Sequence, residues 1–213
     1  MIAREGLAPL TTLAGAGVAL VFSPLPWWVM LIPWPLFAVA LWIYYERRPR
    51  CPAAPNALIS SVNGRVSRVD QCWNPWLNAN ALRVRIDAEL PFTGIIWAPT
   101  EGKILDYWTK AAPFDGPAGR PGEDDSPNCY ALHIRTDEEQ DAVLALSSAG
   151  RFSRLKLDVG PGNRAGQGRR MGFGYFIGYA DLLLDAGSEA RVDVGDPVSA
   201  GETVLAEFTD RAR

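Results

Sequence analysis

The stretch "RVDVGDPVSAGETVLAEF" at residues 191–208 decides the fold class. Its alternating β-branched residues predict short strands, and its Gly-Asp and Ala-Gly pairs predict tight turns between them. Two earlier segments, "ISSVNGRVSRVD" at 59–70 and "IWAPTEGKILDY" at 96–107, likewise open with a strand and a glycine turn. We therefore expect residues 51–213 to form one mainly β domain.

A weak internal repeat strengthens this prediction. "DVGPGNRAG" at 158–166 and "DVGDPVSAG" at 193–201 share D-V-G and A-G. Such patterns are typical of barrel-sandwich hybrids, the architecture of biotinyl and lipoyl carriers. A carrier needs a lysine at an exposed hairpin tip, and Lys103, Lys110 and Lys156 do not occupy one. The pattern therefore indicates the architecture without the carrier function.

Composition excludes several classes of function. The chain has 213 residues, a net charge of -3 and a pI near 5.3, so no basic field favours nucleic acid. Cys51, Cys72 and Cys129 lack zinc-site or disulfide spacing and are interpreted as reduced thiols of a cytoplasmic domain. His133, the single histidine, lies in an alternating strand pattern and is given no catalytic role. No metal site is expected.

Residues 1–50 predict a membrane-anchoring helical hairpin. Two almost uncharged arms, 7–23 and 27–45, are separated by Pro24 and Pro26, which interrupt a continuous helix. About 20 residues span a hydrocarbon core of about 30 Å, so the second arm is long enough and the first is marginal. A signal peptide would lack the second arm, and a buried core hairpin would have a polar face.

Basic residues at both ends of the hairpin predict its orientation. Arg4 precedes the first arm, and Arg47, Arg48 and Arg50 follow the second. The positive-inside rule places both ends on the cytoplasmic face of the membrane. Trp27, Trp28 and Trp34 near the bend suit an interface or the deeper acyl region. Whether the hairpin crosses the bilayer or dips into it stays open.

The stretch "GFGYFIGYADLLL" at 172–184 raises a separate question. It is interpreted as a strand that enters a tight turn, yet the turn offers no nucleophile, acid or metal ligand. The role of this segment can be interpreted only from the order of the segments around it in the chain.

In that order, nearly the whole chain resembles the short form of the bacterial phosphatidylserine decarboxylases. "IAREG" at 2–6 resembles the family's opening, and "YYERRPRCPAAPNALISSVNGRV" at 44–66 is similar to its F-F-R-D-P-x-R…S-P-A-D-G-x-V passage. "IIWAPTEGKI" at 95–104 is similar to H-V-N-R-x-P-x-x-G-x-V. The run at 166–206, "GQGRRMGFGYFIGYADLLLDAGSEARVDVGDPVSAGETVLA", resembles the family's G-M-I-x-F-G-S-R-V-D-L…A-G-E-T-V-L-A segment.

The resemblance implies a self-processing decarboxylase whose reactive groups are replaced here. In the family, a Gly-Ser bond breaks and the serine becomes a pyruvoyl group, with an aspartate and a histidine assisting. The alignment puts the serine at Gly178 and its glycine at Ile177, the aspartate at Asn63 and the histidine at Gly94. We therefore expect no catalytic residue at these three degenerate positions and no pyruvoyl cofactor.

Two main functions remain open at this point. The first is a non-catalytic, membrane-attached homologue on the cytoplasmic face of a bacterial inner membrane, which binds phospholipid headgroups or a partner. That partner is a second copy of the chain or an active decarboxylase homologue. The alternative is an active enzyme that converts phosphatidylserine to phosphatidylethanolamine and CO₂ through an atypical processing site, Ser188 or Ser147-Ser148. Because Ser188 aligns with a Gly-Thr-Glu turn of the family, it is interpreted as a turn residue.

Overall fold

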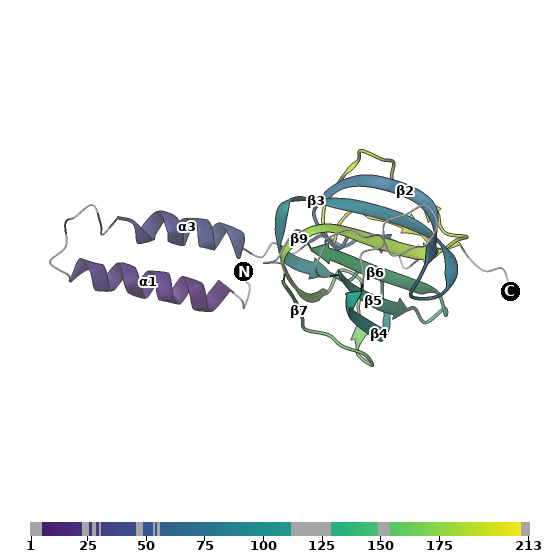
Figure 1. The fold of residues 1–213 in the computed structure, drawn as a ribbon, viewed down its shortest axis with the longest axis horizontal. Helices are drawn as coiled ribbons and strands as arrows, with labels where there is room; N and C mark the ends of the chain where they lie inside the picture. The colour runs from purple at the N-terminus through teal and green to yellow at the C-terminus, as the bar shows by residue number, and fades with distance from the viewer. Residues whose placement is uncertain are drawn as a thin grey trace. The chain divides into compact units, whose positions relative to one another are not determined.

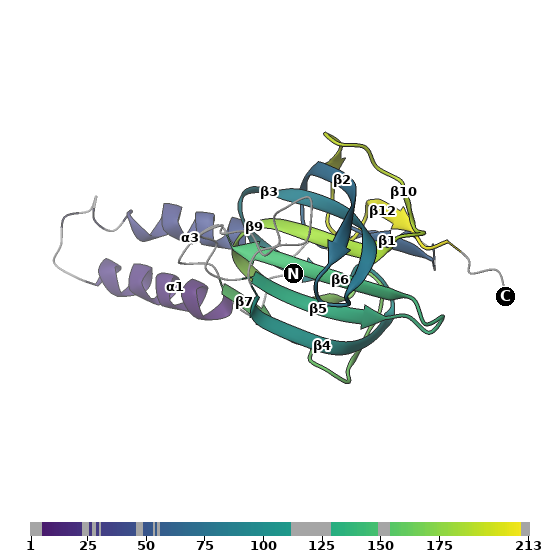
Figure 2. The ribbon, with the colours of Figure 1, turned by 45° about the vertical axis from the view of Figure 1, so that its right-hand side comes forward.

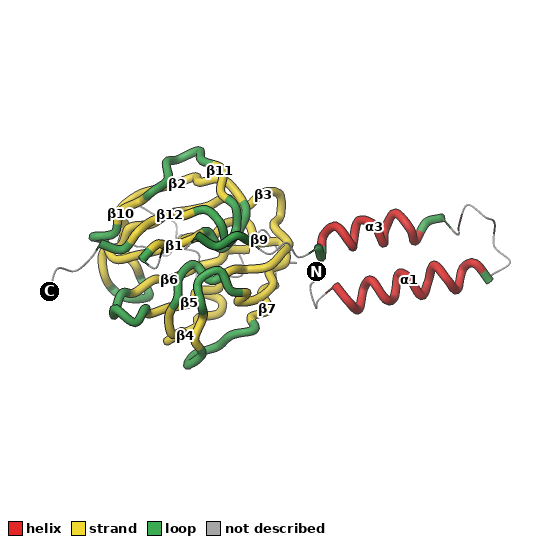
Figure 3. Tube along the Cα trace, turned by 180° about the vertical axis from the view of Figure 1, so that it is seen from behind, coloured by secondary structure: helices red, strands yellow, loops and turns green. Residues whose placement is uncertain are grey.

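The computed structural model describes residues 6–22, 26, 29, 31–45, 49–52, 54, 56–111, 129–148 and 154–209. The chain divides into two compact units, Met1–Arg48 and Pro49–Arg213. The described part of the first is helical and that of the second is built from strands (Figure 1, Figure 3). The fold class is thus mainly β with an N-terminal helical hairpin, as predicted. The predicted boundary between residues 50 and 51 lies close to this division.

The first unit pairs two apolar helices, α1 (Leu7–Val21) and α3 (Pro33–Ile43). They come into contact at Gly17, where an added Cβ atom would lie 3.7 Å from Cβ of Pro33. The helix α3 begins at Pro33, within the second arm predicted at 27–45. Proline is tolerated in the first turn, where its missing N–H would have no helical partner, but disrupts a helix interior.

The surface of the hairpin is apolar. Its exposed large side chains are Leu7, Val18, Phe22, Leu31, Ile32, Trp34, Leu36, Val39 and Tyr45. Arg4, Pro24, Trp27, Trp28, Arg47 and Arg48, on which part of the membrane prediction rests, lie outside the described residues. Within the described chain, none of the helices has both the length and the apolar character needed to cross a membrane. Membrane association of the hairpin stays a prediction.

The second unit is dominated by a curled, nine-stranded sheet (Figure 2). Its strands follow the order β11-β2-β3-β9-β6-β5-β4-β8, and β7 also pairs with β9. Their bounds are β2 (Gly64–Asn74), β3 (Ala79–Trp97), β4 (Gly102–Ala111), β5 (Cys129–Arg135), β6 (Asp141–Ser148), β7 (Arg154–Leu157), β8 (Arg164–Ala165), β9 (Arg170–Asp185) and β11 (Pro197–Val198). A smaller sheet, in the order β1-β12-β10, joins β1 (Ala57–Ile59), β10 (Glu189–Ala190) and β12 (Val204–Glu207).

The strand β9 lies at the centre of the large sheet and is covered on both faces. Its three consecutive leucines, Leu182, Leu183 and Leu184, are all buried, whereas successive strand residues point to opposite faces. Leu182 and Leu184 belong to the main hydrophobic core, and Leu183 belongs to a second cluster with Cys72, Ala81, Cys129, Ala131, Val143 and Ala145. The sheet therefore contributes to two apolar layers, and β9 connects them.

Candidate functional site

The segment predicted as a strand entering a tight turn is instead one continuous strand with an irregular middle. β9 runs from Arg170 to Asp185 without ending near Gly178. Against β6, Ile177 pairs with Ser148 and Tyr179 pairs with Ser147, so Gly178 is an extra residue on β9. The turn prediction was wrong because an extra residue in a paired strand, a β-bulge, carries the same glycine signal as a turn.

A second irregularity lies immediately before the first. Gly174 pairs with Gly94 and Ile177 with Phe92, so β9 advances three residues while β3 advances two. Phe176, inside this step, has a φ of 55°. Large side chains rarely adopt this region, and strained backbone of this kind tends to cluster at functional sites. The position aligned with the family's serine is therefore next to the most unusual backbone of the strand.

Ile177, at the position aligned with the family's glycine, is a core residue. Its side chain is fully buried and belongs to the main hydrophobic core. A Cβ atom added to Gly174 would lie 2.7 Å from Cγ1 of Ile177 and 3.2 Å from Cδ1 of Ile96. The glycine at 174 thus leaves the room that the isoleucine at 177 fills.

Asn63 immediately precedes β2 and has a structural hydrogen bond. Its Oδ1 accepts a hydrogen bond from the backbone N–H of Ala200 at 2.8 Å. Its carbonyl oxygen accepts one from the N–H of Glu89 on β3 at 3.4 Å. The side chain therefore holds the turn before β12 against the start of β2.

The sheet places the three positions aligned with the family's reactive residues on or beside neighbouring strands. Asn63 adjoins β2, Gly94 lies on β3 and Gly178 lies on β9, and these strands are adjacent in the order β2-β3-β9. Gly94 pairs with Gly174 rather than with Gly178, so these two positions are not partners across the sheet. Among the described residues, no hydrogen bond joins any two of the three positions.

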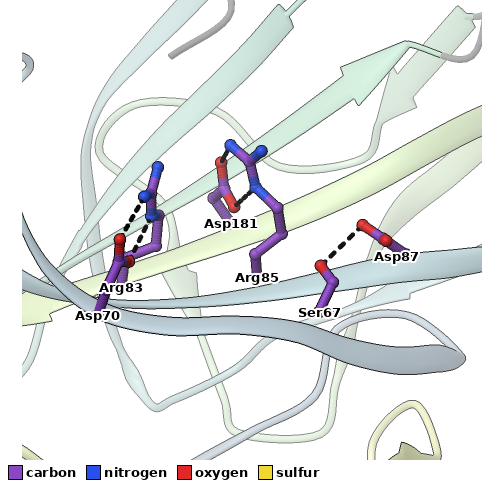
Figure 4. Close-up of polar contacts among 6 residues, drawn as sticks. All are labelled: Ser67, Asp70, Arg83, Arg85, Asp87 and Asp181. Atoms are coloured by element: carbon purple, nitrogen blue, oxygen red, sulfur yellow. Dashed lines mark hydrogen bonds and ion pairs between the residues drawn. The ribbon is translucent and has the colours of Figure 1, made fainter. Parts of the chain in front are cut away.

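A row of ion pairs lies close to these positions and was not anticipated from the sequence (Figure 4). Arg85 of β3 donates two hydrogen bonds to the Asp181 carboxylate of β9, at 2.7 and 2.8 Å, and both side chains are buried. Arg83, fully buried, donates two to Asp70 of β2 at 2.8 and 2.7 Å. Two arginines spaced by two residues in a strand are the signal that identifies this row, because they share one face of the sheet.

Tyr179 adds an aromatic ring to this row. Its ring centroid lies 4.3 Å from Cζ of Arg85, a distance suited to a cation–π interaction. Burial raises the pKa of its phenol above the ordinary value. Arg85 is thus held by a carboxylate and by a ring, both supplied by β9.

His133 lies in a separate ion-pair cluster. Its Nε2 is 2.7 Å from Oδ1 of Asp141, which also accepts a hydrogen bond from Nε of Arg135 at 2.7 Å. Its ring stacks on Trp108 with centroids 6.4 Å apart. Burial alone would raise the pKa of Asp141, but the bonds from His133 and Arg135 outweigh it and hold that pKa at about 2.

All three cysteines are free. Burial raises the pKa of Cys72 to about 11 and that of Cys129 to about 12, so both thiols are unreactive at neutral pH. Cys51 is exposed. In the part of the chain that is described, no three His, Cys, Asp or Glu side chains gather as a metal site requires.

Ser188 follows β9 in a tight turn, where its N–H donates to the carbonyl oxygen of Asp185 at 2.9 Å. Its Oγ is buried without a hydrogen-bond partner among the described residues. A cavity of about 410 Å³ adjoins this turn and is lined by Asn80, Gln140, Asp185, Ala186, Gly187, Ser188, Phe208 and Thr209. It lies beyond the end of β9, whereas Ser147 and Ser148 pair with Tyr179 and Ile177 in the middle of that strand. The two serine sites weighed in the sequence are therefore separate.

Comparison with known proteins places the chain in a family. It is 33% identical to the phosphatidylserine decarboxylase proenzyme of Nitrosomonas eutropha, over 98% of this chain and 95% of that one. The proenzymes of Aromatoleum aromaticum and Burkholderia vietnamiensis are 30% and 28% identical, each over 98% of this chain and 96% of the relative. No family model and no solved structure matches the chain. Identity at this level over nearly the full length shows that the chain belongs to the phosphatidylserine decarboxylase proenzyme family.

Proposed function

We propose that this protein is a membrane-attached, non-catalytic member of the family that binds phospholipid headgroups or a partner in phospholipid metabolism. The observation that carries the proposal is the set of residues at positions 63, 94 and 178, which are Asn, Gly and Gly. Three independent replacements in one colinear match are not explained by a slip of the alignment.

The residues at the processing position do not fit a serine-derived pyruvoyl group. Glycine at 178 has no hydroxyl to attack the preceding carbonyl, so no ester forms there and the chain stays intact. The peptide bond that would break joins Gly178 to Ile177, whose fully buried side chain is part of the core. Asn63 cannot act as a carboxylate base, and its amide oxygen already holds Ala200. In this proposal the family's processing segment has become structural.

Membrane attachment is proposed from the hairpin. Its exposed leucine, valine, phenylalanine and tryptophan side chains would be costly in water and favourable in lipid. The arginines on both flanks favour the cytoplasmic face of a bacterial inner membrane. The proposed partners are a second copy of this chain or an active decarboxylase homologue.

A second candidate is an active enzyme with processing at Ser188. Two observations favour it: the Ser188 hydroxyl has no hydrogen-bond partner among the described residues, and the Thr209 hydroxyl donates to the carbonyl of Gly187, the group that Ser188 would attack. Against it, the single histidine of the chain, His133, is bonded to Asp141. The first candidate is therefore preferred.

Intact-mass spectrometry of the purified full chain separates the two candidates. We expect one uncleaved polypeptide. Processing at Ser188 or at Ser147-Ser148 would yield a C-terminal piece that begins at the processed serine and carries a carbonyl cap. The same sample is incubated with phosphatidylserine vesicles, and we expect no CO₂ above the buffer blank together with slower hydrogen exchange of amides 172–185. A capped fragment or released CO₂ would refute the non-catalytic proposal, and unchanged exchange with every lipid would shift the function to protein partners.

A further inference from the structure

Phe176 is exposed although it lies on the central strand. Its side chain is 42% exposed, and its φ of 55° is unfavourable for a large residue. The conformation persists because the next residue, Ile177, is fixed on both sides, opposite Phe92 on β3 and Ser148 on β6. The bulge thus holds an aromatic ring away from the core while the neighbouring side chain is buried in it.

Two cations lie on the strand that pairs with this part of β9. β7 alternates exposed Arg154 and Lys156 with half-buried Leu155 and Leu157, which pack against the main core. β7 pairs with β9 (Figure 1). The register sets Arg154 opposite Tyr175 and Lys156 opposite Phe173. We call Arg154, Lys156, Tyr175 and Phe176 the β7 surface.

The segment from β7 to the start of β9 carries a charge opposite to that of the whole chain. Residues 154–170 contain five basic side chains and one acidic side chain, whereas the chain as a whole has a net charge of -3. Arg164 is bonded to Asp137, and Arg170 to Asp158. Among the described residues Arg154 has no carboxylate partner. The local excess of positive charge attracts an anionic surface.

We propose that the β7 surface contacts an anionic bilayer, with Phe176 inserted between headgroups and Arg154 and Lys156 close to lipid phosphates. Aromatic rings and basic side chains are the residues that favour the membrane–water interface. The inference rests on the proposed membrane attachment and names the part of the β unit that meets the lipid. A bilayer is favoured over a folded partner because the apolar hairpin belongs to the same chain. A tethered surface needs little affinity of its own, since tethering raises its effective concentration.

The test places a fluorophore that brightens in apolar surroundings at position 176 of the full chain. A Cys51→Ser background leaves only Cys72 and Cys129, which are buried, so Phe176→Cys gives one labelling site. Val194→Cys, 62% exposed in a loop, is the matched control. Both proteins are reconstituted into vesicles of phosphatidylcholine, with or without phosphatidylglycerol. We expect emission at 176 to rise about two-fold or more with the anionic lipid, and to return to the neutral-lipid level in 1 M NaCl, where the Debye length is about 3 Å.

Further measurements separate the possible failures. Replacing Arg154 and Lys156 together by Glu should abolish the increase while leaving vesicle flotation intact. In the unsubstituted chain, amides 154–157 and 174–177 should exchange more slowly with anionic vesicles than with neutral ones, which tests the idea without altering Phe176. If the protein floats with the vesicles but the label at 176 brightens no more than the label at 194, the proposed contact of the β7 surface is overturned and the proposed membrane attachment is not. If the protein does not float with vesicles, both the lipid contact of the β7 surface and the proposed membrane attachment are overturned. If the label at 176 brightens only when extracted membrane proteins are added, the lipid contact is overturned in favour of a protein partner.

Discussion

Replacing Ile177 by alanine should destabilise the protein substantially, because this side chain fills the core at the position where the family's motif has glycine. The side chain is fully buried, so losing about three carbon groups at about 0.8 kcal/mol each removes roughly 2.4 kcal/mol of transfer free energy. If about half of the ~80 Å³ vacated stays empty, the cavity adds about 1 kcal/mol at about 24 cal/mol per Å³. We expect the free energy of unfolding to fall by about 3 to 4 kcal/mol.

Thermal unfolding of the full chain in mild detergent, followed by tryptophan fluorescence, measures this loss. For a chain of this size it corresponds to a decrease in Tm of roughly 6–16 °C. Val194→Ala is the matched control, and its 62% exposed side chain should change the stability by no more than about 0.5 kcal/mol. A loss below about 1 kcal/mol for Ile177→Ala would mean that the bulge lets position 177 collapse freely, and the argument that the processing segment has become structural would be refuted.

Three further predictions concern the charged and thiol groups. Asp181→Asn leaves Arg85 buried without its carboxylate and should cost about 3–5 kcal/mol of unfolding free energy. Asp70→Asn should cost less, because the Asp70 side chain is 37% exposed. Thermal unfolding that ranks the two variants in the opposite order contradicts this. Because the pKa of Asp141 is about 2 in the folded chain and 3.8 ordinarily, its pair stabilises the fold above about pH 4, and about 2 kcal/mol is lost as the pH falls toward 2. Unfolding free energies from pH 5 to 2 check this, and Asp141→Asn should flatten the profile. At pH 8 a maleimide should modify Cys51 in the folded chain, whereas Cys72 and Cys129 should react only after unfolding. Mass spectrometry that shows rapid labelling of all three thiols in the folded chain would contradict the burial of Cys72 and Cys129.

Local patterns were sufficient to predict the class of fold. Strand alternation and glycine turns predicted a mainly β unit, and the uncharged arms around the prolines predicted a helical hairpin. Both signals are read within a few residues, where propensity and hydrophobic periodicity act.

The middle of β9 could not be predicted in the same way. Whether "YFIGY" forms a turn or a bulge depends on its partners, Phe92 and Ser148, which are distant in the sequence. The ion pair of Arg85 with Asp181 depends on the same pairing. The three positions aligned with the family's reactive residues were named from the resemblance alone. Their placement on or beside the adjacent strands β2, β3 and β9 follows from a sheet order that no local pattern contains.

The position of β9 between β3 and β6 also determines when the sheet can form. During synthesis both neighbours leave the ribosome well before residues 170–185, so each must wait with an unpaired edge. Pairing over such sequence separations is slow, because the intervening chain has to be ordered before the contacts form. The helical hairpin, made first and from local contacts, is complete long before that step. The centre of the large sheet therefore forms late, with only the short strands β10, β11 and β12 still to be made. The interval before β9 arrives is when the nascent chain is most exposed to aggregation.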